Sequence, residues 1–334
     1  MAIKVAINGF GRIGRLAYRL MHDDEKFEVV ALNDLSNAEE LAYLLKYDSA
    51  QGKFNREINV VGDKLIVDGK ESVILSEREP KNLPWKELGV ELVLECTGLF
   101  NDEVKASAHI EAGAKRVLLS APAKGNVKMV VYGVNHDILD GTEKIVSAAS
   151  CTTNCLAPMV KTLDDAFGVV KGIMTTVHAY TNDQSLMDQP HKKGYRSRRG
   201  RAAAVSIIPS TTGAANAVGK VLPHLNGKLD GTALRVPVLT GSIVDLTIEL
   251  KQNVTKEEVN EAFKKVSNET LTYTEEPIVS ADVIGALGSI FDANTTQILE
   301  ADGKQLVKVM AWYDNEMSYT AQLIRVLQHL ASLI

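Results

Sequence analysis

Short apolar, β-rich runs alternate with helix-favouring stretches along the first half of the chain. Residues 3–7 form the first such run and residues 27–34 the second, with a helix-favouring segment between them. Similar runs follow at 90–98 and 114–122, and a helix is expected to begin at Glu103 between them. Strands that alternate with helices in this way predict a parallel sheet with crossover helices.

A different pattern interrupts this alternation. Ser36 and Glu39 have the spacing of a capping box at the start of a helix over 37–48. Residues 58–76 then alternate apolar and polar positions around Gly-Asp and Asp-Gly turns. An alternation with period two, broken by such turns, predicts antiparallel hairpins inserted after that helix.

The pattern changes again after residue 150. Long β-like runs occupy 171–181, 232–251 and 304–315, and the helical segments between them, such as 255–269, are fewer and longer. Runs of strands with segregated helices predict an α+β domain, here with a largely antiparallel sheet.

Length and composition agree with two domains of an ordinary globular protein. The chain has 334 residues, of which 45% are hydrophobic and 24% are charged. We expect a first domain over 1–150, completed by a C-terminal helix over 315–334, and a second domain over 151–314.

Charge and cysteine content narrow the function classes. The net charge of −5 at pH 7 gives the chain no general attraction for nucleic acid or an anionic membrane. No apolar stretch approaches the roughly 20 residues that span a bilayer, and the first ten residues lack the pattern of a signal peptide. Three cysteines, an odd number, argue against a disulfide framework. Together these features predict a cytoplasmic protein.

A glycine motif follows the first strand. Gly9, Gly11 and Gly14 have G-x-G-x-x-G spacing, which lets the backbone approach a pyrophosphate at the N-terminus of the next helix. Asp34 ends the second strand, where a carboxylate can accept a hydrogen bond from a ribose hydroxyl and repel a 2′-phosphate. The alternative is a tight turn with a structural aspartate. We favour a Rossmann-type domain that binds NAD rather than NADP.

Two of the three cysteines lie where a strand-like run meets a segment with helical spacing. Cys151 and Cys155 could be buried structural thiols, and Cys96, in an apolar strand, is interpreted as a core residue. A cysteine at a helix N-terminus is instead expected to have a lowered thiol pKa and nucleophilic character. A Cys151–Cys155 disulfide is not expected, because helical spacing holds the two side chains one turn apart. Cys151 is therefore the candidate nucleophile.

His178, which follows a β-branched run, is the candidate partner of Cys151. An imidazole beside a thiol can form a thiolate–imidazolium pair and donate a proton to a developing oxyanion. The residues alone leave open a histidine that is only hydrogen-bonded structure. Groups that suit a phosphate recur in turns, at Thr152, Thr153, Thr181, Thr212, Gly213 and Arg235.

A strongly basic loop occupies residues 191–201, HKKGYRSRRGR, with six Lys and Arg side chains. It contains one aromatic residue, Tyr195, in a chain of net negative charge, which disfavours a nucleic-acid surface. A solvated or interface loop is one alternative. A local source of positive charge for small phosphorylated substrates fits better.

Six motifs, in order along the chain, resemble those of one known family. They are NGFGRIGR, SAASCTTNCLAP, HAYTNDQ, STTGAA, LRVP and WYDNEMSY. Together they closely resemble the phosphorylating glyceraldehyde-3-phosphate dehydrogenases of the bacterial type, over essentially the whole chain. The motif around Cys151 is far more specific than the glycine triplet.

The resemblance implies an NAD-dependent glycolytic enzyme that converts glyceraldehyde 3-phosphate and inorganic phosphate to 1,3-bisphosphoglycerate. Cys151 would attack the aldehyde, and His178 would activate the thiol and handle protons. The thiohemiacetal would give a hydride to NAD, leaving a thioester that phosphate attacks. A homotetramer with the basic loop near subunit interfaces is also implied, and no metal is.

The resemblance assigns binding residues as well. The cofactor positions would be Gly9, Gly11, Arg12, Ile13, Gly14, Asp34, Arg78, Ser120 and Asn315. The substrate and phosphate positions would be Ser150, Thr152, Thr181, Arg199, Thr212, Gly213 and Arg235. The basic loop is longer than the common bacterial form, so Arg198 and Arg201 remain alternatives to Arg199. Gln189-Pro190 stands where many NAD-using members have Leu-Pro, and its proline agrees with NAD.

Two other functions remain open. An erythrose-4-phosphate dehydrogenase would share the fold, the cysteine and the cofactor but release an acid instead of an acyl phosphate. HAYTNDQ and the threonine-rich turns resemble the phosphorylating type more closely. A protein that binds nucleic acid through 191–201 is a different class, and the presence of both Cys151 and His178 argues against a purely binding role.

Overall fold

The computed structural model describes residues 2–334, which form two compact units. Unit 1 extends to Ser150 and also includes Thr320–Ile334, whereas unit 2 comprises Cys151–Tyr319. The last helix, α8 (Met317–Ser332), begins in unit 2 and continues in unit 1.

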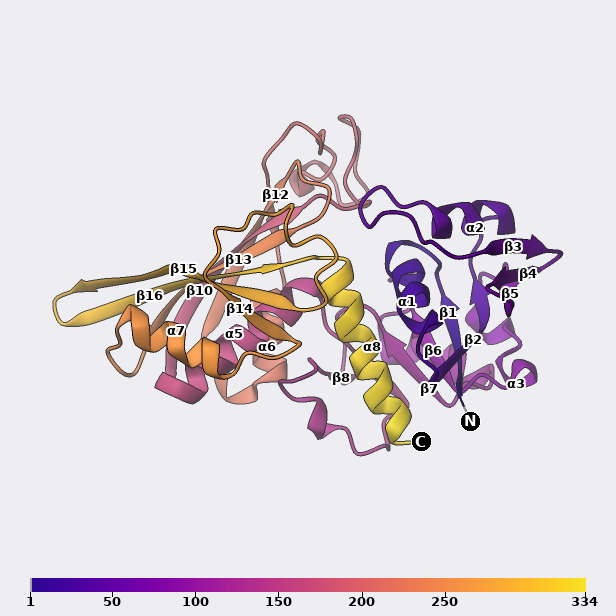
Figure 1. Ribbon diagram of the computed structural model, residues 1–334, viewed down its shortest axis with the longest axis horizontal. Helices are drawn as coiled ribbons and strands as arrows, with labels where there is room; N and C mark the ends of the chain where they lie inside the picture. Colours follow the sequence, from indigo (N-terminus) through magenta and orange to yellow (C-terminus); the bar gives the residue numbers. More distant parts are fainter. Residues whose placement is uncertain (1) are drawn as a thin grey trace. The chain divides into compact units, whose positions relative to one another are not determined.

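The described part of unit 1 contains a nine-stranded sheet and its covering helices (Figure 1). The strands are β1 (Ile3–Asn8), β2 (Phe27–Asn33), β3 (Ile58–Val61), β4 (Lys64–Val67), β5 (Lys70–Leu75), β6 (Leu92–Glu95), β7 (Arg116–Leu119), β8 (Lys128–Met129) and β9 (Ile145–Ser147). The helices are α1 (Arg12–His22), α2 (Ala38–Lys46), α3 (Trp85–Leu88) and α4 (Glu103–Glu111). The strand order is β3-β4-β5-β2-β1-β6-β7-β9-β8, parallel from β5 onward and antiparallel among β3, β4 and β5.

Helices cover both faces of this sheet because successive residues of a strand point to opposite sides. Ile7 of β1 belongs to the same core as Met21 of α1 and Leu327 of α8. Its neighbour Ala6 belongs to a second core with Ala106 of α4 and Trp85 of α3. Burying each large apolar side chain contributes about 1.5–3 kcal/mol, so β1 is anchored from both sides.

The predicted alternation of strands and helices, and the inserted antiparallel hairpins, are confirmed in unit 1. The predicted capping box is wrong by one position. Asn37, not Ser36, is the N-cap of α2, and its side chain accepts a hydrogen bond from the backbone N–H of Glu40 at 2.8 Å. Asn and Ser cap helices about equally well, so local preference did not distinguish the two positions.

Unit 2, in its described residues, contains a seven-stranded sheet of mostly antiparallel pairs. Its helices are α5 (Cys151–Phe167), α6 (Ala214–Val221) and α7 (Lys256–Lys265). Its strands are β10 (Val169–Ala179), β11 (Ile208–Thr211), β12 (Leu229–Val236), β13 (Ser242–Leu250), β14 (Leu271–Thr274), β15 (Ser289–Ala301) and β16 (Lys304–Tyr313). The order is β11-β12-β10-β13-β16-β15-β14, and only the β10–β12 and β14–β15 pairs are parallel among these strands.

The three helices of unit 2 lie on one side of its sheet, as Figure 1 shows. Along β13, buried residues such as Val244 and Leu246 alternate with half-buried ones such as Ile243 and Asp245. This alternation is expected when one face packs on helices and the other does not.

The structure divides the run predicted over 232–251 into two strands. Pro237 follows β12, and Gly241, at φ +91°, precedes β13. Both residues favour a break in a strand. The thirteen-residue strand β15 was not predicted. Among the described residues, no helix is both long and apolar enough to cross a membrane.

Candidate functional site

The carboxyl ends of β1, β2 and β6 surround a cavity of about 590 Å³ in unit 1. β1 lies between β2 and β6 in the sheet, so the strand order reverses at β1. Open α/β sheets bind their ligands in the crevice at such a point. Four predicted cofactor residues line the cavity: Gly9, Gly11, Asp34 and Arg78.

The glycines of the motif allow close backbone approach. A Cβ at Gly9, which has φ +93°, would lie 2.8 Å from the backbone N of Thr97. A Cβ at Gly14 would lie 2.1 Å from the carbonyl oxygen of Gly9. Gly11 is the N-cap of α1 and has open space around its Cα, so a ligand can approach the N-terminal N–H groups of the helix. This geometry fits the pyrophosphate of a dinucleotide.

Asp34 is held in a fixed orientation at the edge of the same cavity. Its carboxylate accepts hydrogen bonds from the backbone N–H of Phe10 at 2.8 Å and of Ser36 at 3.0 Å. A fixed carboxylate beside this cavity suits a ribose diol and opposes a 2′-phosphate.

The other predicted cofactor residues do not line this cavity. Arg12 pairs with Asp48 at 2.5 Å, Ile13 packs against the core, and Ser120 follows β7, where its N–H donates to the carbonyl of Glu95 at 3.0 Å. Asn315 lies in unit 2, and its Oδ1 accepts from Ser242 Oγ at 2.8 Å. Since its oxygen is an acceptor there, its Nδ2 is left as the donor toward any ligand.

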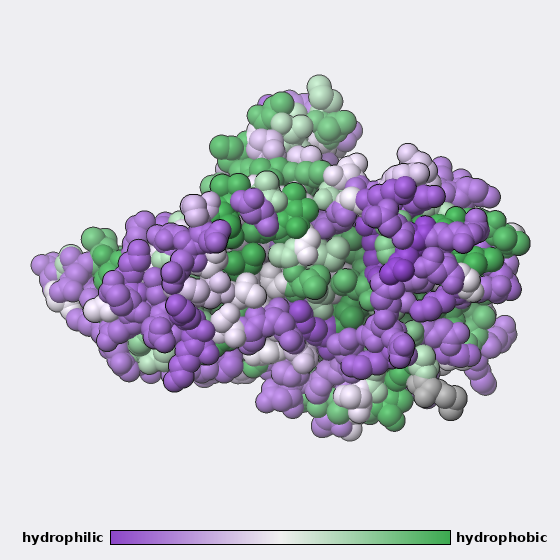
Figure 2. Space-filling model, in the orientation of Figure 1, coloured by the Kyte–Doolittle hydropathy of each residue, from purple (hydrophilic) through white to green (hydrophobic). Residues whose placement is uncertain are grey.

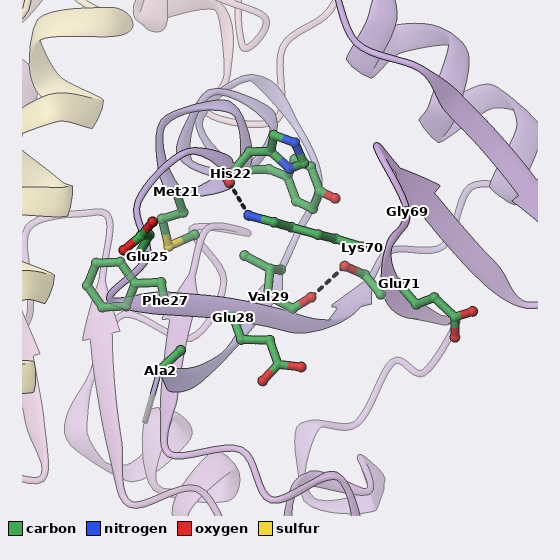
Figure 3. A pocket seen from close by; sticks show the side chains of 12 residues that line it. Ala2, Met21, His22, Glu25, Phe27, Glu28, Val29, Gly69, Lys70 and Glu71 are labelled. Atoms are coloured by element: carbon green, nitrogen blue, oxygen red, sulfur yellow. Dashed lines mark hydrogen bonds between the residues drawn. The ribbon is translucent and has the colours of Figure 1, made fainter.

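A second cavity of unit 1, about 510 Å³, lies at the amino ends of β2 and β5 (Figure 3). Lys70 extends across it, and its Nζ donates to the carbonyl oxygen of His22 at 2.6 Å. The cavity contains none of the predicted site residues. Because open parallel sheets bind ligands at the carboxyl ends of their strands, we assign the cofactor to the other cavity.

Cys151 is the first residue of α5, as the sequence predicted, and a strained turn precedes it. Ala149 has a left-handed conformation, φ 59°, and its N–H donates to Ser147 Oγ at 3.1 Å. For a residue with a Cβ this conformation costs about 1–2 kcal/mol. The turn takes the chain from β9 into α5 and leaves the Cys151 thiol at the helix N-terminus.

His178, in β10, lies beside the thiol. Its Nε2 is 3.4 Å from Cys151 Sγ, and its Nδ1 is 2.7 Å from the carbonyl oxygen of Ala179. A carbonyl only accepts, so Nδ1 carries the hydrogen and Nε2 presents a lone pair to the thiol. The imidazole is therefore prepared to take the thiol proton.

Burial decides the resting protonation of this pair. Desolvation raises the pKa of the Cys151 thiol, although Arg235 and the backbone N–H groups at the helix start oppose it. Desolvation, reinforced by the charge of Arg235, lowers the pKa of His178 to about 3. The expected lowering of the thiol pKa is therefore wrong, because the helix N-terminus has a smaller effect than burial. A lone thiolate and a lone imidazolium are both disfavoured, so the two groups ionise together by proton transfer between them.

Two arginines stand near this pair. The parallel register of β10 and β12 places Arg235 beside His178, and Arg235 Nη1 donates to Thr181 Oγ1 at 3.0 Å. Arg199 Nε donates to Ser210 Oγ at 3.1 Å. Desolvation is the largest cause of the lowered pKa of His178, and the charges of Arg235 and Arg199 lower it further. The site therefore has the charge to hold an anion.

The structure separates the alternatives within the basic loop. The Arg199 side chain is 15% exposed and forms an ion pair with Asp183. Arg201 is 69% exposed and pairs with Asp188 instead. Arg198 is exposed as well. These positions favour Arg199 as the anion-binding arginine.

The remaining predicted substrate residues are arranged differently. The hydroxyl of Thr152 shares a hydrogen bond with the Tyr313 OH at 2.9 Å and also contacts Cys151 Sγ at 4.0 Å, so both the side chain and the backbone N–H of Thr152 oppose the rise in the thiol pKa. Thr212 and Gly213 directly precede α6, and Gly213 is its N-cap. In the β11–β12 pair just before them, Thr211 lies opposite Thr232, three residues from Arg235. Ser150 directly precedes Cys151 and belongs to unit 1.

Sequence reasoning missed two residues of this site. Asp183 accepts a hydrogen bond from Thr181 Oγ1 and pairs with Arg199. Tyr313 OH also contacts Thr176 Oγ1 at 2.8 Å, and its ring stands edge-on to His178. The two lie inside the motifs HAYTNDQ and WYDNEMSY, but nothing in their spacing indicated these contacts. Among residues 2–334 no cluster of three or more His, Cys, Asp or Glu side chains is arranged to hold a metal ion.

We predict that iodoacetamide alkylates Cys151 much faster than the other two thiols. Burial raises the pKa of Cys96 and of Cys155 to about 12, and only Cys151 has an imidazole to accept its proton. Replacing that acceptor, His178→Asn, should slow Cys151 alkylation at least tenfold, since general-base help is worth roughly 10² to 10⁴ in rate.

Peptide mapping over time measures this order. Cys155→Ser is the matched control and should leave the rate at Cys151 within about twofold, because the Cys155 thiol points to the carbonyl of Ala311. Labelling of Cys155 or Cys96 before Cys151 would contradict the assignment.

Comparison with known proteins connects these two sites to one family. Residues 150–315 match the family model described as glyceraldehyde 3-phosphate dehydrogenase, C-terminal domain, and residues 3–103 match its NAD binding domain. The chain is 59% identical over 331 residues to a glyceraldehyde-3-phosphate dehydrogenase of Clostridium pasteurianum, with 99% of both chains covered. It is 54% identical over 335 residues to one of Streptococcus pyogenes, covering all of this chain and 99% of the relative. The protein therefore belongs to the glyceraldehyde-3-phosphate dehydrogenase family, with an NAD-binding domain followed by the family's C-terminal domain.

Proposed function

We propose that the protein oxidises glyceraldehyde 3-phosphate with NAD and inorganic phosphate to give 1,3-bisphosphoglycerate, as part of glycolysis. The observation that carries this proposal is the Cys151–His178 pair at 3.4 Å, with Arg235 in register beside the imidazole. A nucleophile with its own base and an adjacent cation suits covalent catalysis on a phosphorylated aldehyde.

The first step uses the proton-transfer pair. The thiol proton moves to His178 Nε2 as Cys151 Sγ bonds to the aldehyde carbon, and the imidazolium then protonates the developing oxyanion to complete a thiohemiacetal. The backbone N–H of Thr152 and the helix N-terminus stabilise the negative charge that develops here. Gly9, Gly11 and Asp34, which line the cavity of unit 1, would hold NAD, which would supply the hydride acceptor for oxidation of the thiohemiacetal. His178 Nε2 takes up the hydroxyl proton of the thiohemiacetal in this oxidation, which leaves a thioester on Cys151 and a protonated imidazole.

The second half of the reaction uses the cationic side of the site. Arg199, Arg235 and Thr181 hold phosphate groups through charge-assisted hydrogen bonds. An oxygen of inorganic phosphate attacks the thioester carbon, the C–S bond breaks, and Cys151 regains its proton from the imidazole. The acyl phosphate then leaves.

The two alternative functions are not favoured. The relatives from Clostridium and Streptococcus are named glyceraldehyde-3-phosphate dehydrogenase, and none of their names points to erythrose 4-phosphate or to nucleic acid. In the basic loop, Arg199 and Arg201 pair with Asp183 and Asp188, so part of its charge is already compensated. We further propose a cytoplasmic location, because the three cysteines are free thiols and the reaction needs Cys151 reduced.

We also propose a homotetramer. Large hydrophobic side chains of the segment after β10 are strongly exposed, including Leu186, Met187, Val205 and Ile207. Figure 2 shows hydrophobic side chains gathered where unit 2 projects beyond β12. Contiguous apolar patches of this kind usually mark protein–protein interfaces.

Light scattering of the purified protein should therefore give about four times the chain mass of 36.3 kDa. Replacing two exposed apolar residues, in Leu186→Asp with Val205→Asp, should reduce this mass, because a buried unpaired carboxylate opposes association. A monomeric wild-type protein at micromolar concentration would overturn the proposal.

We expect Asp34 to determine cofactor choice. Asp34→Gly removes the carboxylate that would repel a 2′-phosphate, so the ratio of kcat/KM for NAD over that for NADP should fall at least tenfold, about 1.4 kcal/mol. Asp34→Asn is the second variant: it keeps the size of the side chain but has one acceptor oxygen, so it can accept from Phe10 or from Ser36 but not from both. Steady-state kinetics with both cofactors measure the ratio, and an unchanged ratio in both variants would assign the discrimination to other groups.

A final experiment separates thioester formation from phosphate attack. Mixing enzyme, NAD and glyceraldehyde 3-phosphate without phosphate should give a burst of NADH near one per active site, followed by slow hydrolysis, which is the kinetic mark of a covalent intermediate. Arg199→Ala should keep the burst and slow the phosphate-dependent phase, whereas His178→Asn should suppress the burst by roughly 10² or more.

Arg201→Ala is the control, because Arg201 lies in the same loop but is exposed and pairs with Asp188. It should change neither phase by more than about twofold. Stopped-flow absorbance at 340 nm resolves the two phases. A strict need for phosphate in the first turnover would exclude the thioester scheme.

A further inference from the structure

A buried carboxylate lies next to residues that line the cofactor cavity, without lining it itself. Glu95, the last residue of β6, is 2% exposed. Its Oε1 accepts hydrogen bonds from the backbone N–H of Thr97, at 2.7 Å, and from the Thr97 hydroxyl. Its Oε2 accepts from Asn8 Nδ2 at 2.5 Å and from His109 Nε2 at 3.1 Å.

The indole of Trp85 fixes the tautomer of His109. Trp85 Nε1 is 3.0 Å from His109 Nδ1, and an indole N–H can only donate. His109 Nδ1 must therefore carry a lone pair, and the hydrogen of the neutral ring sits on Nε2, where it points at Glu95. His109 thus donates a hydrogen bond to the carboxylate, and the two oxygens of Glu95 face four hydrogen-bond donors.

The same carboxylate connects the ends of three strands. Asn8, which ends β1, accepts at its Oδ1 from Asn33 Nδ2, at the end of β2, at 2.6 Å. Asn33 in turn accepts from the backbone N–H of Glu77 at 2.9 Å. Asn8, Asn33, Glu77 and Thr97 all line the cofactor cavity, so one network anchored at Glu95 fixes four points on its wall.

The network also holds the gap that the glycine motif needs. The backbone N of Thr97 lies 2.8 Å from where a Cβ of Gly9 would be, and Glu95 holds that same N–H. Gly9 and Thr97 both line the cavity, so a shift of Thr97 relative to Gly9 would change the shape of its wall.

We propose that Glu95 is a positioning residue for NAD: its buried carboxylate, held by Asn8, Thr97 and His109, sets the shape of the cofactor cavity without touching the cofactor. The proposal goes beyond the reaction proposed above, because it concerns binding of NAD alone. A carboxylate that merely stabilised the sheet would have no specific effect on cofactor affinity.

The test is Glu95→Gln, which keeps the shape of the side chain but places an amide donor opposite the donors of Asn8 and His109. Because the mismatched donors shift Asn8 and Thr97 on the cavity wall, the Kd for NAD, measured by isothermal titration calorimetry, should rise at least tenfold, about 1.4 kcal/mol. The KM for glyceraldehyde 3-phosphate at saturating NAD should stay within twofold. A loss of activity with unchanged Kd would instead concern the reaction proposed above and leave Glu95 without this role.

Glu91→Gln is the matched control. Glu91 precedes the amino end of the same strand, where it accepts from the backbone N–H of Lys4 and pairs with Lys115. It links β1 and β6 as Glu95 does, but at the opposite end of the sheet. The control variant should leave the Kd for NAD within twofold.

A milder variant covers the case in which Glu95→Gln does not fold. Thr97→Val removes one donor to the carboxylate at nearly constant volume, and it should raise the Kd for NAD more than twofold. Urea unfolding without NAD gives the stability of each variant. A folded Glu95→Gln protein with wild-type Kd, an equal loss in Glu91→Gln, or an unchanged Kd in Thr97→Val would each overturn the proposal.

Discussion

Desolvation of charge is the constraint on which the chemistry of this protein depends. His178 is buried and Cys151 is half-buried, and desolvation disfavours the charged form of each. The same rule governs the cofactor domain, where Asp34 is held by two backbone N–H groups and Glu95 by four donors. In each case a charge is tolerated because rigid donors face it before any ligand arrives.

Strand ends supply those rigid donors. In unit 1, β1, β2 and β6 run parallel, so Asn8, Asn33 and Thr97 meet at one edge of the sheet. In unit 2, the β10–β12 pair is parallel within a mostly antiparallel sheet, and this pairing brings His178 and Arg235 into register. Parallel pairing places the two carboxyl ends together, which is why both sites draw residues from segments far apart in sequence.

This arrangement explains which parts of the site the sequence could predict. Gly9, Asp34 and Cys151 follow rules of short-range spacing, and the structure places the first two on one cavity and the third at a helix N-terminus. The direction of the thiol pKa shift could not be predicted, because it depends on how far packing removes the thiol from water and on the opposing charge of Arg235, which is distant in the chain. The Arg199–Asp183 pair depends likewise on how an irregular loop folds back.

The fold was predictable to a similar degree. The alternating first half and the inserted hairpins follow from the periodicity of apolar residues. β15 was missed because it is recognisable as a strand only through its pairing with β16. The hydroxyl of Thr152 forms a hydrogen bond with Tyr313, 161 residues away in the chain, which the sequence did not indicate. Periodicity reports which face of a segment is buried, but it does not report which residue lies opposite.

The left-handed turn at Ala149 has a consequence for which residues this position can accept. Glycine would remove the conformational cost of about 1–2 kcal/mol, but it would also gain freedom in the unfolded chain, which costs about 0.5–1 kcal/mol. The second term offsets about half of the first, and glycine would also lose the methyl group of Ala149, which is fully buried. Any larger side chain would have to displace packed neighbours while keeping the same unfavourable backbone. Position 149, two residues before the nucleophile, therefore accepts only alanine or glycine on steric grounds.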